Sequence, residues 1–188
     1  MRIMLALATT AVLAMTGTGC AREGAVNGMA PAGDWPAGVK EAEVYSQVLR
    51  RYLSTPGESS FPEGSITAVY VLDQAYPGVA DPITPTEGGR PITAVTQQQV
   101  VTALADLHKV TFIADRATVI ETRDGCEQVK DDGVLMTLGP VEGDDNEATV
   151  GVYGYVACLG ATWLTYVVRN DPGTGWRVTG TTGPMAIS

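Results

Sequence analysis

Residues 148–169, ATVGVYGYVACLGATWLTYVVR, decide the fold that we predict for this chain. β-Branched and aromatic residues dominate this stretch, and they recur with the period of two that is typical of strands. The LGA triplet at residues 159–161 separates two such runs. We therefore predict two antiparallel strands, residues 148–158 and 162–169, joined by a short connection.

The sequence on both sides of this pair predicts more strands. Residues 134–141 precede the pair and residues 176–182 follow it, each with apolar residues typical of strands. Asp124-Gly125 and Asp132-Gly133 are pairs that favour tight hairpin turns. From residue 118 onward the chain therefore predicts an antiparallel meander.

The first half of the domain predicts helices and two further strands. Residues 39–54 carry apolar side chains at helical spacing and are followed by Pro56-Gly57. Thr96 and Gln99 form a capping box that predicts the start of a second helix. The remaining predicted elements are a strand at residues 65–73, a long Pro- and Gly-rich loop at residues 76–95, and a short strand at residues 110–114. That loop is equally consistent with a functional segment and with a tolerated insertion.

The predicted fold class is α+β, with two N-terminal helices packed on a twisted, mainly antiparallel meander sheet. This order of elements is similar to that of cystatin-like and nuclear-transport-factor-2-like rolls. The resemblance concerns architecture alone, and such folds serve as enzymes, ligand binders and inert modules alike.

The N-terminus predicts export. Met1-Arg2 is a short basic start, and residues 3–15 are almost entirely apolar. As a helix this run would span about 20 Å, which is less than the roughly 30 Å of bilayer hydrocarbon. A basic end, a short apolar run and small residues are typical of a cleaved signal.

Gly17-Thr18-Gly19-Cys20 resembles the lipobox of bacterial lipoproteins. The resemblance implies cleavage before Cys20 and a lipid anchor of diacylglycerol, with acyl chains such as palmitate, on its sulfur. Residues 1–19 would then be a signal peptide, residues 20–38 a lipidated flexible tether, and residues 39–188 a single domain. The alternative is an ordinary secretory signal cut near Ala21.

The three cysteines are consistent with export. If Cys20 carries lipid, Cys126 and Cys158 remain as a pair, and in an exported chain such a pair favours a disulfide. Two buried free thiols are the alternative. Two cysteines and one histidine cannot complete a four-ligand zinc site without carboxylates, so we predict no metal site.

Composition and motifs exclude several functions. The 188 residues include 12 lysines and arginines against 21 aspartates and glutamates, a net charge of −9, so we expect no nucleic-acid partner. His108, the only histidine, ends a predicted helix, and no nucleophile elbow, zinc-protease or phosphate-loop motif occurs. We therefore assign no catalytic residue and expect no cofactor. The acidic residues around Asp144-Asp145 predict a solvated turn.

The aromatic residues of the meander are the strongest candidates for a surface with a function. If Tyr155 lies opposite Thr165 and Val167 opposite Val178, one face of the sheet carries Tyr153, Tyr155, Trp163 and Trp176. The other face carries Val152, Val156, Leu164, Tyr166 and Val168. We favour the aromatic face as the core under the helices; otherwise it is a ligand or partner surface.

Asp73 ends a strand that looks buried, and a carboxyl at such a place could take part in acid–base chemistry. We add this residue to the candidate surface.

The sequence therefore predicts an exported lipoprotein, anchored to the outer side of the bacterial cell membrane, that binds an unknown protein or small molecule without transforming it. A small enzyme with a pocket in the curved sheet, using Asp73, Tyr70 or Tyr155, is one alternative. A structural or inhibitory envelope protein is the other.

Overall fold

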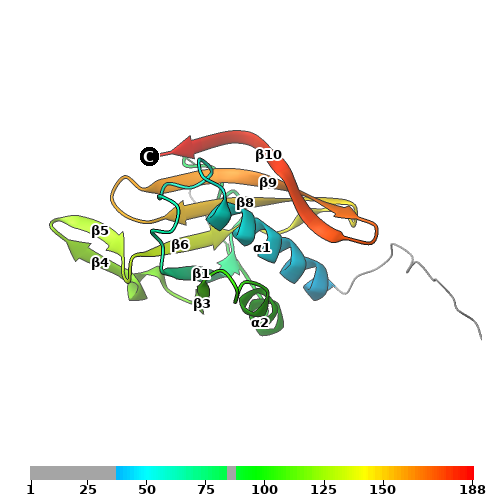
Figure 1. Cartoon of the computed structure of the whole chain (residues 1–188), viewed down its shortest axis with the longest axis horizontal. Helices are drawn as coiled ribbons and strands as arrows, with labels where there is room; N and C mark the ends of the chain where they lie inside the picture. The colour runs from blue at the N-terminus through cyan, green and yellow to red at the C-terminus, as the bar shows by residue number, and fades with distance from the viewer. Residues whose placement is uncertain (1–36, 84–87) are drawn as a thin grey trace, which may run out of the picture. The chain divides into compact units, whose positions relative to one another are not determined.

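The computed structural model describes residues 37–83 and 88–188 (Figure 1). The predicted signal peptide, Cys20 and nearly all of the predicted tether lie outside the described residues. In chain order the elements are α1 (Ala37–Ser54), β1 (Ala68–Ala75), β2 (Arg90–Pro91), α2 (Ala94–Ala103), β3 (Lys109–Ile113), the 3-10 helix η1 (Arg116–Thr118), β4 (Ile120–Arg123), β5 (Cys126–Val129), β6 (Gly133–Leu138), β7 (Glu142–Gly143), β8 (Glu147–Tyr155), β9 (Ala161–Asp171) and β10 (Gly175–Ile187).

The main sheet has the strand order β10-β9-β8-β6-β1-β2, with β3 also paired to β1 and β7 to β8. Pairing is antiparallel except between β1 and β6 and between β1 and β3. The predicted combination of helices with a mainly antiparallel sheet is therefore confirmed. The two helices are not consecutive, because β1 and β2 lie between them along the chain.

Helix α1 forms as its apolar spacing predicts. Its side chains Val44, Tyr45, Val48, Leu49 and Tyr52 are completely buried. They belong to one cluster with residues from a single face of the sheet, namely Val152, Leu164, Tyr166 and Val168. We call this face the helix side of the sheet. Its burial removes most of the apolar surface of α1 from water, which is the main source of stability for such a helix.

Helix α2 begins earlier than its sequence predicts. Its cap is Thr93, whose Oγ1 accepts a hydrogen bond from the Thr96 amide at 3.1 Å. Thr96, the predicted cap, lies inside the helix and is completely buried. The prediction was wrong because both threonines suit a helix start, and the choice depends on Thr96 packing against α1 through Glu41.

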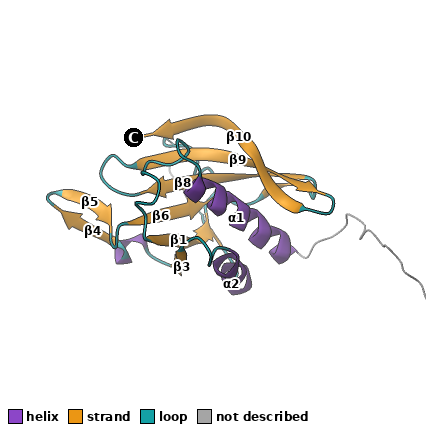
Figure 2. Ribbon diagram, in the orientation of Figure 1, coloured by secondary structure: helices purple, strands orange, loops and turns teal. Residues whose placement is uncertain are grey.

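Of the two predicted hairpin turns, only one forms. Asp124 and Gly125 have φ values of 53° and 79° and join β4 to β5 in a small sheet beside the main one (Figure 2). Asp132-Gly133 does not make a hairpin, because β6 leaves β5 and pairs in parallel with β1. Buried strand β1 needs hydrogen-bonding partners along both edges, and this long-range requirement overrides the local turn signal.

The strand register also differs from the predicted one. Tyr155 pairs with Ala161, and Val178 pairs with Val168. A shift of one residue in β10 moves every side chain to the other face, so Trp176 lies on the helix side and is only 3% exposed. The prediction that Trp176 shares a face with the other aromatic residues was therefore wrong, and so was the prediction that the aromatic face is covered by the helices.

A disulfide joins Cys126 and Cys158, whose Cα atoms are 5.5 Å apart, and this prediction is confirmed. Cys126 begins β5, and Cys158 lies in the connection between β8 and β9. Two backbone hydrogen bonds reinforce the junction: Val129 N–H donates to Val156 O at 2.8 Å, and Cys158 N–H donates to Glu127 O at 3.0 Å. The bond therefore ties the β4–β5 hairpin to the main sheet.

A chain of polar contacts ties the end of α1 to β9. The Tyr166 hydroxyl donates to Glu58 at 2.9 Å, and Arg51 pairs with the same carboxylate at 2.6 Å. Burial alone would raise the pKa of the Glu58 carboxyl, but the hydrogen bonds from Arg51 and Tyr166 outweigh it. The pKa of Glu58 is therefore held below its usual range.

We predict that Cys126→Ser and Cys158→Ser each lower the free energy of unfolding by about 2–4 kcal/mol. The reason is that either change removes the same covalent link from the unfolded ensemble. Urea denaturation of both variants, compared with wild type before and after reduction, measures the effect. Reduced wild type should match the variants, and equal midpoints for oxidised wild type and both variants would contradict the prediction.

We predict that Glu58→Gln destabilises the fold by about 1 kcal/mol at pH 7, because it removes hydrogen bonds to a charged group with partly exposed partners. Since the folded pKa lies below the unfolded value of 4.5, this stabilisation is present above that value and is lost as the pH falls through the folded pKa.

Urea midpoints measured from pH 7 to pH 3 should therefore converge for wild type and Glu58→Gln at the acid end. Glu63→Gln, at an exposed glutamate, is the control and should follow wild type throughout. A constant gap between wild type and Glu58→Gln across this range would rule out the titration of Glu58 as the cause.

Candidate functional site

The face of the sheet opposite the helix side carries a cavity of about 460 Å³. We call it the aromatic cavity. Its lining comes from four strands and from the segments that follow β1 and β3. Leu72, Leu135 and Thr137 line it from β1 and β6, while Tyr153 and Trp163 line it from β8 and β9.

The cavity is built on a pair of stacked rings. Tyr153 and Trp163 are direct partners in the β8–β9 ladder, so their side chains emerge next to each other. Their ring centroids are 5.0 Å apart with an interplanar angle of 27°. Both side chains are half-buried. Burial raises the pKa of Tyr153, although the Arg116 guanidinium partly opposes this, so its hydroxyl remains neutral and can donate or accept a hydrogen bond.

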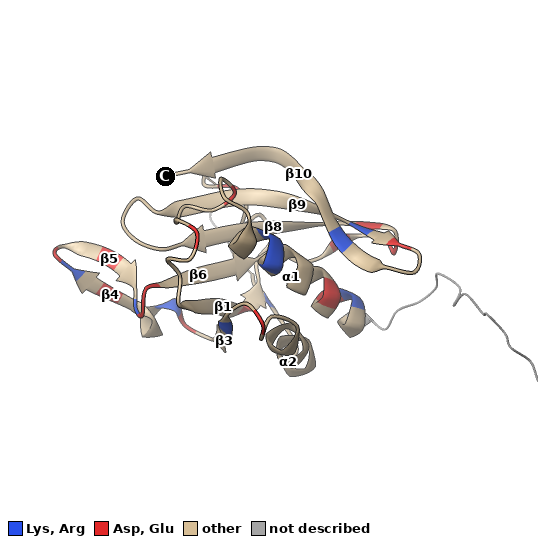
Figure 3. Ribbon diagram, in the orientation of Figure 1, with Lys and Arg blue, Asp and Glu red and all other residues tan. Residues whose placement is uncertain are grey.

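Charged side chains of both signs line the rest of the cavity. Asp115 and Arg116 begin the segment after β3, and Asp81 lies in the loop after β1. Asp115 Oδ1 accepts a hydrogen bond from Ala117 N–H at 2.8 Å, and Asp81 Oδ1 accepts one from Ile83 N–H at 2.9 Å. Each carboxylate is thus oriented by its own turn. Along the ribbon of the described residues, acidic and basic positions are interspersed (Figure 3).

The β4–β5 hairpin covers the part of this face next to the cavity. Tyr155 is 8% exposed and packs in a second cluster with Val119 and Val129 from the hairpin region. Its hydroxyl donates to Glu127 O at 2.7 Å, and the Arg116 guanidinium lies 5.8 Å from its ring centroid. Tyr155 therefore serves as the joint between hairpin and sheet rather than as a cavity wall.

The structure brings together only part of the predicted site. Tyr153 and Trp163 line the aromatic cavity, Tyr155 lies next to them in the hairpin joint, and Trp176 lies on the opposite face. Asp73 does not line the cavity. Its backbone oxygen accepts a hydrogen bond from Ile92 N–H, and its buried Oδ1 has no hydrogen-bond partner among the described residues.

Sequence reasoning missed the charged residues of the cavity: Asp81, Asp115 and Arg116. They follow β1 and β3, which are parallel neighbours, so the segments after both strands leave the sheet at the same edge. The sequence signal for these residues was a polar pair after a short strand, as in Asp115-Arg116. This signal could indicate a shared site only once β1 and β3 were known to pair in parallel.

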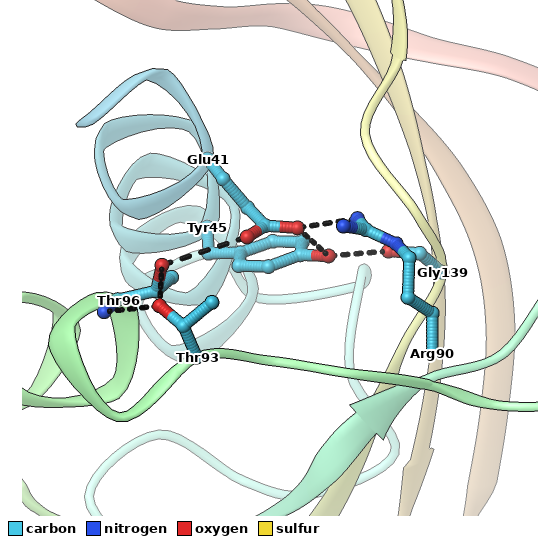
Figure 4. Close-up of polar contacts among 6 residues, drawn as sticks. All are labelled: Glu41, Tyr45, Arg90, Thr93, Thr96 and Gly139. Carbon is cyan, nitrogen blue, oxygen red and sulfur yellow. Dashed lines mark hydrogen bonds and ion pairs between the residues drawn. The ribbon is translucent and has the colours of Figure 1, made fainter. Parts of the chain in front are cut away.

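A second polar cluster lies between α1, β2 and α2 (Figure 4). Glu41 is 7% exposed and pairs with Arg90 at 2.5 Å, and Thr96 Oγ1 lies 3.5 Å from its second oxygen. The Tyr45 hydroxyl lies 3.4 Å from Glu41 and donates to Gly139 O at 3.0 Å. Burial, reinforced by the Glu41 charge, raises the pKa of Tyr45, so the phenol stays protonated.

This cluster is a structural junction. A buried carboxylate is costly unless it is paired and hydrogen-bonded, and Glu41 meets both conditions through residues of two other segments. The cluster therefore holds β2 and the start of α2 against α1. A cavity of about 500 Å³ lies beside it, lined in part by Lys40, Glu41 and Arg90. Lys40 is engaged there by Asp145 at 3.3 Å.

The remaining sequence candidates have local structural roles. His108 follows α2, and its amide donates to Leu104 O at 3.2 Å; it does not line the aromatic cavity. Asp144 Oδ1 accepts from the amides of Asn146 and Glu147, which closes the acidic turn. Within residues 37–83 and 88–188, no group of three or more histidine, cysteine, aspartate or glutamate side chains is arranged to hold a metal ion.

Comparison with known proteins does not add a family to this description. No protein-family model matches the sequence, and no curated protein or solved structure is significantly similar to it.

Proposed function

We propose that this chain is a membrane-tethered lipoprotein of the bacterial cell envelope whose domain binds a small ligand in the aromatic cavity without transforming it. The observation that carries the proposal is the stacked, half-buried pair Tyr153 and Trp163 in a cavity of about 460 Å³. Cavities of roughly 300–1,000 Å³ with an apolar lining and a few polar groups are typical of small-molecule sites.

The position of the core favours a binding role for these rings. The helix side of the sheet already contains the large completely buried residues of α1, β8 and β9. Tyr153 and Trp163 lie outside that cluster, yet each keeps part of its ring surface in the cavity. Large aromatic rings that stay partly accessible inside a cavity are typical of ligand contacts.

The residues considered for an enzyme have other partners. The Tyr70 hydroxyl donates to Asp131 at 2.6 Å, and burial together with that carboxylate raises its pKa to about 12. The Tyr155 hydroxyl is bonded to Glu127 O, and Asp73 is not part of the cavity lining. Among the described residues that line the cavity there is no histidine, cysteine, serine or lysine. Binding therefore fits this lining better than catalysis by a histidine base or by a serine, cysteine or lysine nucleophile.

The proposed location rests on the sequence at the N-terminus. The lipobox-like residues 17–20 motivate a lipid anchor, with residues 20–38 as a tether and residues 39–188 as one exported domain. No helix in the described part of the chain is long and apolar enough to cross a membrane. We also propose that the architecture is similar to that of cystatin-like or nuclear-transport-factor-2-like rolls, with both helices packed on a curved sheet.

We predict that compounds bound by the protein lose at least about tenfold in affinity in Trp163→Leu, because the change removes one ring of the stacked pair. Leucine keeps apolar volume at the site and so limits the loss of stability. A thermal-shift screen of small polar-aromatic and amphipathic compounds identifies binders, and calorimetry on both proteins gives the affinities.

Leu159→Ala is the matched control, because Leu159 is exposed in the neighbouring β8–β9 connection and should not change binding. Binders whose affinity is unchanged in Trp163→Leu would exclude the aromatic cavity as their site. A folded protein without any binder would favour the structural or inhibitory alternative.

We predict that Cys20→Ser abolishes acylation and leaves the chain unprocessed or released from the membrane. The reason is that the serine hydroxyl cannot replace the thiol that receives the lipid. Mass spectrometry of the mature protein and fractionation of cells expressing either form measure the outcome. An unmodified Cys20 in mature wild-type protein would overturn the proposed anchor.

A further inference from the structure

We propose that the ligand of the aromatic cavity carries an organic cation, of the alkylated ammonium class, that sits against the rings of Tyr153 and Trp163. The inference rests on the proposed function and specifies the chemistry of the ligand at that same site. Two observations carry it: the aromatic pair, and the way this face already holds cations.

The aromatic rings provide the principal attraction. The face of an aromatic ring is electron-rich and attracts a cation within about 6 Å, most strongly when water is excluded. Tyr153 and Trp163 stack on each other at 5.0 Å, so they present adjoining ring surfaces in a partly buried site. An alkylated ammonium group suits such a site, because its charge is surrounded by apolar carbon and needs no hydrogen-bond acceptor.

The same face of the sheet already uses this interaction within the protein. The Arg116 guanidinium lies 5.8 Å from the ring centroid of Tyr155, and Lys130 Nζ lies 5.7 Å from that of Tyr70. The Tyr153 ring lies next to that of Tyr155, with centroids 6.5 Å apart, and both Tyr153 and Trp163 pack against the second cluster, but no cation–π contact to Tyr153 or Trp163 occurs among the described residues. The Tyr153–Trp163 pair is thus the part of the aromatic surface left for a cation from outside.

The charges that line the cavity are mixed. Asp115 contributes an exposed carboxylate, whereas the Arg116 guanidinium lies close enough to Tyr153 to oppose the rise in its pKa. The whole chain carries −9, so its long-range field also attracts cations. An anionic ligand would depend on Arg116, the one basic residue in the described lining.

The test compares three probes of nearly equal shape by calorimetry on the full mature chain. Choline is cationic, 3,3-dimethylbutan-1-ol is its neutral isostere, and 3,3-dimethylbutanoate is an anionic one. We expect choline to bind at least about tenfold more tightly than the other two. We expect added salt to weaken choline binding.

Two variants link this binding to the cavity. Trp163→Leu should weaken choline at least about tenfold, and Asp115→Asn about threefold to tenfold. Asparagine can still cap η1, so the turn is kept while its charge is removed. Asp124→Asn is the control: it removes one negative charge at the tip of the β4–β5 hairpin, where asparagine tolerates the positive φ, and should leave binding unchanged.

Each other outcome overturns the inference in a distinct way. Equal binding of choline and its neutral isostere, with both lost in Trp163→Leu, would keep the cavity as a binding site but remove the preference for a cation. Tightest binding of the anionic probe would assign the specificity to Arg116. If no probe binds to the folded protein, the cation inference fails, while the proposed binding function is decided separately by the compound screen.

Discussion

The antiparallel pairing of β8 with β9 controls which side chains reach each face of the sheet. The ladder runs without a break from Glu147 opposite Arg169 to Tyr155 opposite Ala161. Because side chains alternate, Val152 and Leu164 point to the helix side while Tyr153 and Trp163 point to the cavity. One register therefore creates the core under α1 and the aromatic pair together. A slip by one residue would exchange the two faces and leave α1 against a polar and aromatic mixture.

Local signals in the sequence predicted the elements that depend on local physics. Helix α1 follows from its apolar spacing, the β4–β5 hairpin from Asp124-Gly125, and the disulfide from the pairing of Cys126 with Cys158 that export would favour. The elements that depend on distant partners were missed. The parallel pairing of β1 with β6 and β3, and the β9–β10 register that places Trp176 opposite Asn170, leave no signature within a short window of sequence. The charged part of the cavity was missed for the same reason, because Asp81 and Asp115 line one cavity only through that pairing.

Carboxylates have two different roles in this fold, as Glu41 and Asp115 of the cavity lining show. Glu41 is surrounded by partners from other segments, and its charge is neutralised by Arg90 inside a junction of three elements. The carboxylate of Asp115 is oriented by a backbone amide of its own turn and remains exposed beside the cavity. A buried carboxylate with several protein partners contributes to the fold, whereas an oriented, accessible one is available to a ligand.

The bond between Cys126 and Cys158 has a consequence for where the protein can work. It fastens the hairpin that follows η1, and η1 begins with Arg116 directly after its cap Asp115. In a reducing compartment this disulfide would be missing. The segment that carries Asp115 and Arg116 would then be held by non-covalent contacts only, including those of Tyr155. If the domain is exported as proposed, oxidation after export completes this fastening, and a chain still inside the cell lacks it at the face that carries the aromatic cavity.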